Sequence, residues 1–310
     1  MVACRKQLGW TLACALKCAG YWRTALKRLD QSNSIICAYG HRPSKRSFEK
    51  YINKLLSMGF SFISDKEVAS ILSREISPSR RSVWLSFDDG FQSNLTNVVP
   101  VLIEHNIPAT FFVCPAAVES GWQWFDVAYE ILPILPVASI EELHRLPHAQ
   151  RSALITDAIA EKRFAPKRTT MTPEEISALS ANPLFSVQNH TSNHALLPTC
   201  SDAEVLSEVL AASDSIAQWT GVKPTFFSYP CGAYSPSHFS ALKKAYIPYA
   251  VTTDPRFLDP KSSNPLEIPR TDFIDNGAVS ENICQTLGIW RLAIDRLKHR
   301  ITCRDDKSDP

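Results

Sequence analysis

The stretch Val83-Trp-Leu-Ser-Phe-Asp-Asp-Gly90 is the most informative part of this 310-residue chain for its fold class. Residues 83–87 are mostly apolar and predict a strand. Two carboxylates and a glycine, Asp88-Asp89-Gly90, then end that strand abruptly. Such a sequence is typical of an ordinary turn, but functional groups also gather at the carboxyl ends of strands in α/β sheets and barrels. We therefore treat Asp88 and Asp89 as candidate site residues.

Strands and helices are predicted to alternate on both sides of this stretch. Further strands are expected at 34–39, 60–63, 109–113, 185–189, 225–229 and 249–253. Helices are expected at 48–58, 65–72, 95–105 and 201–220, with a further helix starting at 172. This alternation, without an internal repeat, predicts an α/β fold with a largely parallel sheet or barrel.

The domain organisation is predicted to be simple. A basic amphipathic helical segment covers 1–33, and one catalytic domain follows over 34–275. A mostly helical pattern over about 121–170 is interpreted as an insertion that covers one face of that domain. An amphipathic helix and tail complete the chain over 276–310.

Composition excludes several classes of protein. With 45% hydrophobic residues, the chain is too apolar for a disordered protein and too long for a disulfide-stapled mini-fold. Its 33 basic and 31 acidic residues give a net charge of +2, which argues against nucleic acid as the main partner. Nine cysteines, an odd number without a CxxC pair, favour a reducing compartment and hence a cytoplasmic location.

Both ends of the chain are basic and amphipathic. The apolar residues 8–22 are interrupted by Lys17, and a membrane-spanning helix needs about 20 mostly uncharged residues. Residues 1–30 carry six cations against the single Asp30, and residues 290–300 again alternate apolar and basic side chains. Two interpretations stay open: peripheral contact with an anionic membrane surface, or, preferred here, solvated helices that pack on the core.

Two histidine pairs have the spacing HxxxH. His190-Thr-Ser-Asn-His194 follows a predicted strand, so its two imidazoles can converge as metal ligands, although two polar loop histidines would look the same. The other pair, His144 and His148, lies in the helical insertion with Pro147 between its members. We interpret that second pair as a surface feature.

Two further motifs occur in the last third of the chain. Phe227-Ser-Tyr-Pro-Cys-Gly232 is a strand that runs into a Pro-x-Gly turn, a geometry that can aim a backbone N–H into a cleft. In Ile268-Pro-Arg-Thr-Asp272, Arg270 is either the partner of a buried carboxylate or an ordinary surface charge. The aromatic cluster at 122–125 is interpreted as core packing in preference to a sugar-stacking platform.

Together these motifs resemble the NodB-homology polysaccharide deacetylases over about residues 34–273, with the Ser86–Gly90 and His190–His194 motifs as the strongest parts. The early Ala38-Tyr-Gly-His-Arg42 is similar to the Tyr-His-Arg segment of the exopolysaccharide branch. The resemblance implies a distorted (β/α) barrel. It also implies a metal-dependent enzyme that removes N-acetyl groups from GlcNAc-type residues of a polysaccharide, oligosaccharide or lipid-linked glycan.

The resemblance also implies roles for individual residues. It makes Asp89, His190 and His194 the metal ligands, with Zn²⁺ expected and Co²⁺, Mn²⁺ or Ni²⁺ compatible with the same set. It makes Asp88 the catalytic base, the backbone N–H of Cys231 the oxyanion donor and His41 the candidate general acid. The family's usual arginine in the third motif is Ser228 here, so Arg270 becomes the candidate partner that keeps Asp88 ionised.

Two other functions are compatible with parts of this pattern. A catalytically inactive carbohydrate-binding protein could use the same scaffold, but simple sugar binding does not require all four of Asp88, Asp89, His190 and His194. A non-haem iron oxygenase also uses two histidines and one carboxylate. In such sites a histidine and the carboxylate are usually close in sequence, whereas Asp89 and His190 lie about 100 residues apart.

Overall fold

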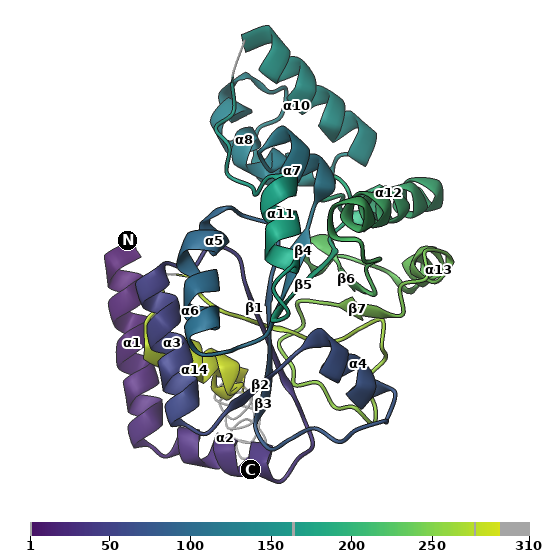
Figure 1. Ribbon diagram of the computed structural model, residues 1–310. Helices are drawn as coiled ribbons and strands as arrows, with labels where there is room; N and C mark the ends of the chain where they lie inside the picture. The colour runs from purple at the N-terminus through teal and green to yellow at the C-terminus, as the bar shows by residue number, and fades with distance from the viewer. Residues whose placement is uncertain (1, 163–164, 276, 292–310) are drawn as a thin grey trace, which may run out of the picture.

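The computed structural model describes residues 2–162, 165–275 and 277–291, and its centre is a strongly curled parallel sheet (Figure 1). The strands are β1 (Ile36–Gly40), β2 (Ser61–Ile63), β3 (Ser82–Phe87), β4 (Ala109–Val113), β5 (Phe185–Asn189), β6 (Phe226–Ser228), β7 (Tyr249–Val251) and β8 (Thr271–Asp272). They run in the order β7-β6-β5-β4-β3-β1-β8, and β2 also pairs with β3. All seven predicted strands are present, and β8 is an addition to the prediction.

One segment joins the two edges of the sheet. Ile268 bridges in parallel to Val251 of β7, and its N–H donates to the carbonyl oxygen of Ala250 at 2.8 Å. Three residues further on, β8 begins and pairs in parallel with β1 at the opposite edge. The segment therefore closes the sheet into the distorted (β/α) barrel that the family resemblance implies, and it carries Arg270 across the closure.

Strand register determines which residues meet at the end of the barrel. β1 and β3 pair from Ile36 with Val83 through to Gly40 with Phe87, so the two strands end side by side. β4 and β5 likewise end together at Val113 and Asn189. The residues directly after β1, β3 and β5 are therefore delivered to the same end of the barrel.

Helices surround the barrel. They are α1 (Val2–Cys18), α2 (Tyr21–Asp30), α3 (Lys45–Ser57), α4 (Asp65–Leu72), α5 (Ser93–Asn97), α6 (Val99–Glu104), α7 (Pro115–Ser120), α8 (Trp124–Ile131), α9 (Ile140–Arg145), α10 (His148–Lys162), α11 (Pro173–Ser180), α12 (Asp202–Thr220), α13 (Phe239–Lys244) and α14 (Val279–Thr286). The single helix predicted over 95–105 is wrong: α5 and α6 divide it, because Pro100 lacks the N–H that a continuous helix needs.

The segment between β4 and α11 forms a separate helical layer. α8, α9 and α10 pack around a small hydrophobic cluster of their own, which includes Val127, Leu143 and Ile155. In Figure 1 this layer projects beyond the end of the barrel where β4 and β5 finish. The predicted insertion thus covers one end of the barrel, beside the loops that come after the strands.

The N-terminal helices lie along one side of the barrel, next to α3 and α14 (Figure 1). Trp22, Ala25 and Leu29 of α2 are buried, and the Trp22 indole N–H donates to Cys284 Sγ at 3.2 Å. Among the described residues, no helix has the length and apolar character that crossing a bilayer would require. The basic amphipathic pattern predicted over 290–300 lies largely in residues 292–310, outside the described residues.

Candidate active site

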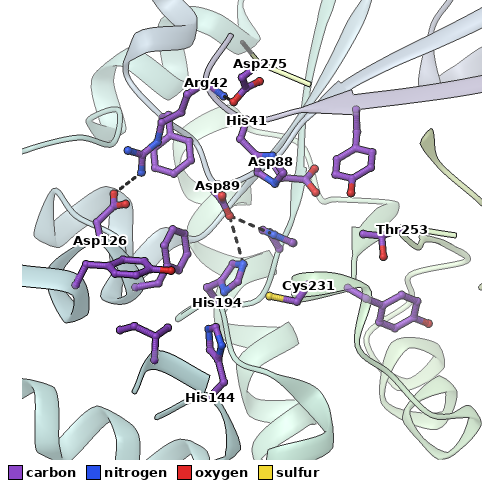
Figure 2. A pocket seen from close by; sticks show the side chains of 17 residues that line it. His41, Arg42, Asp88, Asp89, Asp126, His144, His194, Cys231, Thr253 and Asp275 are labelled. Carbon is purple, nitrogen blue, oxygen red and sulfur yellow. Dashed lines mark hydrogen bonds and ion pairs between the residues drawn. The ribbon is translucent and has the colours of Figure 1, made fainter. Parts of the chain in front are cut away.

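A cavity of about 590 Å³ opens at the carboxyl ends of the strands (Figure 2). Its walls contain six of the seven predicted site residues: His41, Asp88, Asp89, His190, His194 and Cys231. The seventh, Arg270, lies directly behind Asp88. Side chains from loops after four different strands therefore share one cavity, although they are spread over more than half of the sequence.

Asp89, His190 and His194 form a compact buried group. Asp89 Oδ1 lies 3.4 Å from Nε2 of His190 and 3.4 Å from Nε2 of His194. Ligand atoms of the three side chains all lie within 4.8 Å of one another. Asp89 Oδ1 is buried and accepts no hydrogen bond from any described residue. Two imidazole nitrogens and one carboxylate oxygen that converge without another partner fit a divalent metal such as Zn²⁺.

The loop 190–194 brings its two histidines together without forming a helical turn. Thr191 and His194 both adopt left-handed backbone conformations, with φ of 61° and 49°. Asn189 Oδ1 accepts the Thr191 N–H at 2.8 Å, and Glu208 Oε2 on α12 accepts the Asn193 N–H at 2.8 Å. Sequence reasoning did not identify Asn189 and Glu208, because a side chain that holds a loop has no motif of its own.

The environment of each imidazole determines its protonation. Nδ1 of His190 lies 2.7 Å from the carbonyl oxygen of Ser228, so this nitrogen donates and Nε2 faces Asp89 as a lone pair. Burial lowers the pKa of His194 to about 3, so this side chain is neutral, the form that binds metals. Burial also disfavours the charge on His190, but the adjacent Asp89 and Asp88 carboxylates raise its pKa overall.

Asp88 is held by a buried bidentate ion pair. Arg270 Nη1 donates to Asp88 Oδ1 at 2.8 Å and Nη2 to Oδ2 at 2.6 Å. Arg270 is 0% exposed, and its guanidinium also lies over the Tyr39 ring, 4.3 Å from the ring centroid. Burial works against the charge on Asp88, but the guanidinium outweighs it, so the pKa of Asp88 is lowered and the carboxylate stays ionised.

Ser228 takes part in the same network. Its hydroxyl donates to Asp88 Oδ2 at 3.1 Å and accepts from Arg270 Nη2 at 2.8 Å. Ser228 occupies the position at which the NodB-homology family usually carries an arginine. This small residue leaves room for Arg270. The guanidinium reaches Asp88 from the segment that closes the barrel.

Replacing Arg270 by methionine is expected to destabilise the protein by about 3–5 kcal/mol, because it leaves the Asp88 charge buried without a partner. Chemical denaturation of the purified variant measures the change. Arg256→Met is the matched control, since its ion pair with Asp254 is exposed and should contribute less than about 1 kcal/mol. Equal losses of stability in the two variants would contradict the role of Arg270 as the partner of the buried Asp88 charge.

Cys231 lies in a tight turn at the mouth of the cavity. The Gly232 N–H donates to the carbonyl oxygen of Tyr229 at 2.8 Å, with Pro230 in second position and Cys231 left-handed at φ 56° in third, the pattern of a type II turn. A Cβ atom on Gly232 would lie 2.0 Å from Thr253 Oγ1, so this position requires glycine. The Cys231 N–H is not among the hydrogen bonds that close the turn, which leaves it as a candidate donor to a ligand.

His41 enters the cavity directly after β1. Its ring lies edge-on to Tyr39, with centroids 5.6 Å apart, and Figure 2 shows it close to Asp88. Asp275, on the loop after β8, also lines the cavity, and its Oδ2 accepts the Arg42 N–H at 2.8 Å. Burial raises the pKa of Asp275. No motif in the sequence marks Asp275 as a site residue.

The helical insertion supplies another part of the cavity wall. Phe125 lies 5.0 Å from the His194 ring, centroid to centroid, and Trp124 donates its indole N–H to the His194 carbonyl oxygen. His144 also lines the cavity, with its ring 5.2 Å from that of Trp124. The prediction that the His144 and His148 pair is a surface feature is therefore wrong for His144. The interpretation of the aromatic cluster as core packing is wrong for Phe125, which faces the cavity.

Comparison with known proteins agrees with this geometry. Residues 75–250, more than half of the chain, match the polysaccharide deacetylase family model. The chain belongs to the polysaccharide deacetylase family. The matched region contains the Asp89, His190 and His194 group together with Asp88 and Cys231. His41 and Arg270 lie outside the matched region, although they reach the same cavity.

Two curated polysaccharide deacetylases are related to this chain at low sequence identity. YxkH of Bacillus subtilis is 22% identical over 223 residues, which cover 72% of this chain and 63% of that protein. The poly-β-1,6-N-acetyl-D-glucosamine N-deacetylase of Staphylococcus aureus is 23% identical over 241 residues, 75% of this chain and 68% of that protein. The chain thus spans just under two thirds of the first relative.

Solved structures show the same fold. A Streptococcus pyogenes deacetylase, PplD, in complex with acetate aligns with a TM-score of 0.61 at 18% identity, covering 82% of this chain and 98% of that one. IcaB from Ammonifex degensii aligns with a TM-score of 0.58 at 20% identity, covering 76% and 90%. At this level of identity the likeness establishes the barrel architecture of the polysaccharide deacetylases.

Proposed function

We propose that this protein is a metal-dependent hydrolase that removes N-acetyl groups from GlcNAc-type residues of a polysaccharide, oligosaccharide or lipid-linked glycan. One observation carries the proposal: the converging Asp89, His190 and His194 group lies beside a carboxylate, Asp88, that a buried arginine keeps ionised. The name of the Staphylococcus aureus relative, a poly-β-1,6-N-acetyl-D-glucosamine N-deacetylase, supports the choice of substrate class.

Asp89, His190 and His194 would hold the metal. A divalent cation such as Zn²⁺ held there would supply Lewis acidity toward a water molecule and the amide carbonyl. The unpartnered Asp89 Oδ1 and the orientation of the His190 ring by Ser228 support this assignment.

The remaining residues move protons and hold charge. Asp88 accepts the proton of the attacking water, and its ion pair with Arg270 keeps it in the basic form. The Cys231 N–H donates to the oxyanion that develops on the carbonyl oxygen. His41 gives a proton to the departing amine, which cannot leave as an anion. Figure 2 shows His41 beside Asp88, with Cys231 at a separate place in the cavity wall.

Acetate release from a panel of N-acetylated glycans, with and without a chelator, tests the proposed function. We expect chelator-sensitive release that returns when a divalent metal is added back. Glycan binding that is indifferent to chelator, with no acetate formed from any substrate, would instead identify a catalytically inactive binding protein. Oxygen consumption during turnover would point to oxygenase chemistry.

Replacing His41 by alanine is expected to affect amide and ester substrates differently. Release from an N-acetyl sugar should fall by about 100-fold, because the amine leaving group needs a general acid. Hydrolysis of an activated aryl acetate should change much less, because a phenolate departs without a proton. Steady-state kinetics on the two substrates measure the difference, and equal losses on both would contradict the role of His41 as the acid.

We also propose a cytoplasmic location. The seven described cysteines that are free thiols, three of them buried, support this location. Fractionation of the native host, with the protein detected by antibody, tests it.

A further inference from the structure

A second groove, of about 770 Å³, lies between α1, α3 and the beginning of α14. Its lining includes four cations and two indoles: Lys17, Arg46, Lys50, Lys54, Trp10 and Trp22. We call it the basic groove. α1 and α3 run side by side at this edge of the molecule in Figure 1, and the proposed chemistry does not use any of the six side chains.

Within the part of the chain that the structure describes, the four cations of the basic groove have no ion-pair partner. No carboxylate of these described residues lines the groove. Nζ of Lys17 and Nζ of Lys54 both lie over the ring of Trp22, 5.2 and 5.9 Å from its centroid. Cations gathered in this way repel one another, so an anion bound among them would be stabilised.

The beginning of α14 adds backbone donors to the same groove. Ala278, the N-cap residue, lines the groove and has no side chain that could accept the first N–H groups of the helix. Val279 and Ser280 of the first turn line it as well. Such N–H groups favour anions. The first turn also contains Glu281, whose carboxylate lies against Gly9 of α1, so the attraction for an anion comes mainly from the four side-chain cations.

The basic groove adjoins the candidate active site through two segments of chain. Arg42 lines the cavity, and Ser44, two residues later, lines the groove. Asp275 lines the cavity, and Gly277, again two residues later, lines the groove. Two trans peptide units span at most about 7–8 Å, so along the Arg42–Ser44 segment the cavity and the groove lie close to each other.

We propose that the basic groove binds a phosphate group of the glycan whose N-acetylated sugar lies in the cavity. This inference rests on the proposed function and narrows its substrate class to glycans that carry phosphate. An uncharged GlcNAc polymer would gain little from four unpaired cations. Each deacetylation of such a polymer would also create an ammonium group that these cations repel. The four cations attract a phosphate-bearing glycan before the reaction, and they still attract its phosphate after deacetylation has created an ammonium group on the reacting sugar.

An anionic membrane surface is the competing occupant. Trp10 is 53% exposed and could enter a lipid interface. Trp22, however, is only 8% exposed and lies beneath the lysines, and Ser44 of the groove is only two residues from Arg42 of the catalytic cavity. These two observations favour the substrate over the membrane.

Two substrates that differ by one phosphate group test the inference: a GlcNAc tetramer, and the same tetramer with phosphate on its reducing-end oxygen. For the unmodified protein we expect kcat/KM to be at least about tenfold higher for the phosphorylated tetramer, and this preference should shrink as salt screens the charges. The double variant Arg46→Gln with Lys50→Gln should lose the preference. The matched control Lys243→Gln with Lys244→Gln removes the same charge from α13 and should keep it.

The outcomes distinguish failure of the phosphate site from failure of the proposed function. Acetate release from both tetramers with equal kcat/KM, or a preference that survives the Arg46 and Lys50 changes, would overturn the phosphate site and leave the deacetylase assignment standing. Absence of release from every N-acetylated substrate would contradict the proposed function, and the inference would fall with it. Flotation with phosphatidylglycerol vesicles that the double variant abolishes, with no preference between tetramers, would assign the groove to the membrane and overturn the inference.

Discussion

Asp88→Asn is expected to lower acetate release by two to four orders of magnitude, the range that a positioned general base contributes, while the metal stays bound. Asparagine keeps the size of the side chain but cannot accept the proton of the attacking water. Asp88 itself is not one of the three converging ligand side chains, so the metal site should persist. Measuring acetate together with metal content by elemental analysis separates the two effects.

The control for this variant is Asp126→Asn. Asp126 also lines the cavity and also pairs with an arginine, Arg42, but it has no role in the proposed proton transfers. Its replacement should cost much less activity than that of Asp88. An Asp88→Asn protein that is folded, contains metal and keeps more than about a tenth of the activity would exclude Asp88 as the base.

His190→Ala is expected to lose the metal and, with it, essentially all acetate release. The variant removes one of three ligands and also the ring that the Ser228 carbonyl oxygen orients. Activity should fall to the level of the unmodified protein treated with chelator, because both preparations lack the same Lewis acid. Metal content after dialysis, and acetate release with added Zn²⁺, are the measurements.

His144→Ala is the matched control for this loss of metal. His144 is another histidine of the same cavity, half-buried where His190 is buried, and it lies outside the group of Asp89, His190 and His194. Its removal should leave the metal stoichiometry unchanged. A normal metal content in the His190 variant, or an equal loss in the His144 variant, would contradict the ligand assignment.

The predicted strands and the order of the motifs agree with the structure because both depend on local sequence. The apolar run 109–113 forms β4 with the predicted bounds, and 83–87 forms most of β3. Parallel strands deliver the residues after their carboxyl ends to one side of the sheet, so Asp88, Asp89 and His190 could be expected to meet. The resemblance to a known family added His41 and Cys231 to the same site.

The sequence did not predict several contacts that connect distant parts of the chain. The sequence left open whether Arg270 is the partner of a buried carboxylate or a surface charge. Only the closure of the barrel through Ile268 places it behind Asp88. His144 lay in a segment whose local pattern predicts a helix but not which wall that helix forms. Glu208 reaches the 190–194 loop from α12, and no local pattern marks such a contact.

The chemical groups of this protein and their order follow from the chain alone, because strand propensity, turn residues and motif spacing are properties of neighbouring residues. Their distances and charge states depend on folding. The 3.4 Å approach of Asp89 to each histidine, the neutral His194 and the buried pair of Asp88 with Arg270 exist only where barrel closure excludes water. Burial and long-range contact are collective properties, so no single stretch of the sequence encodes them.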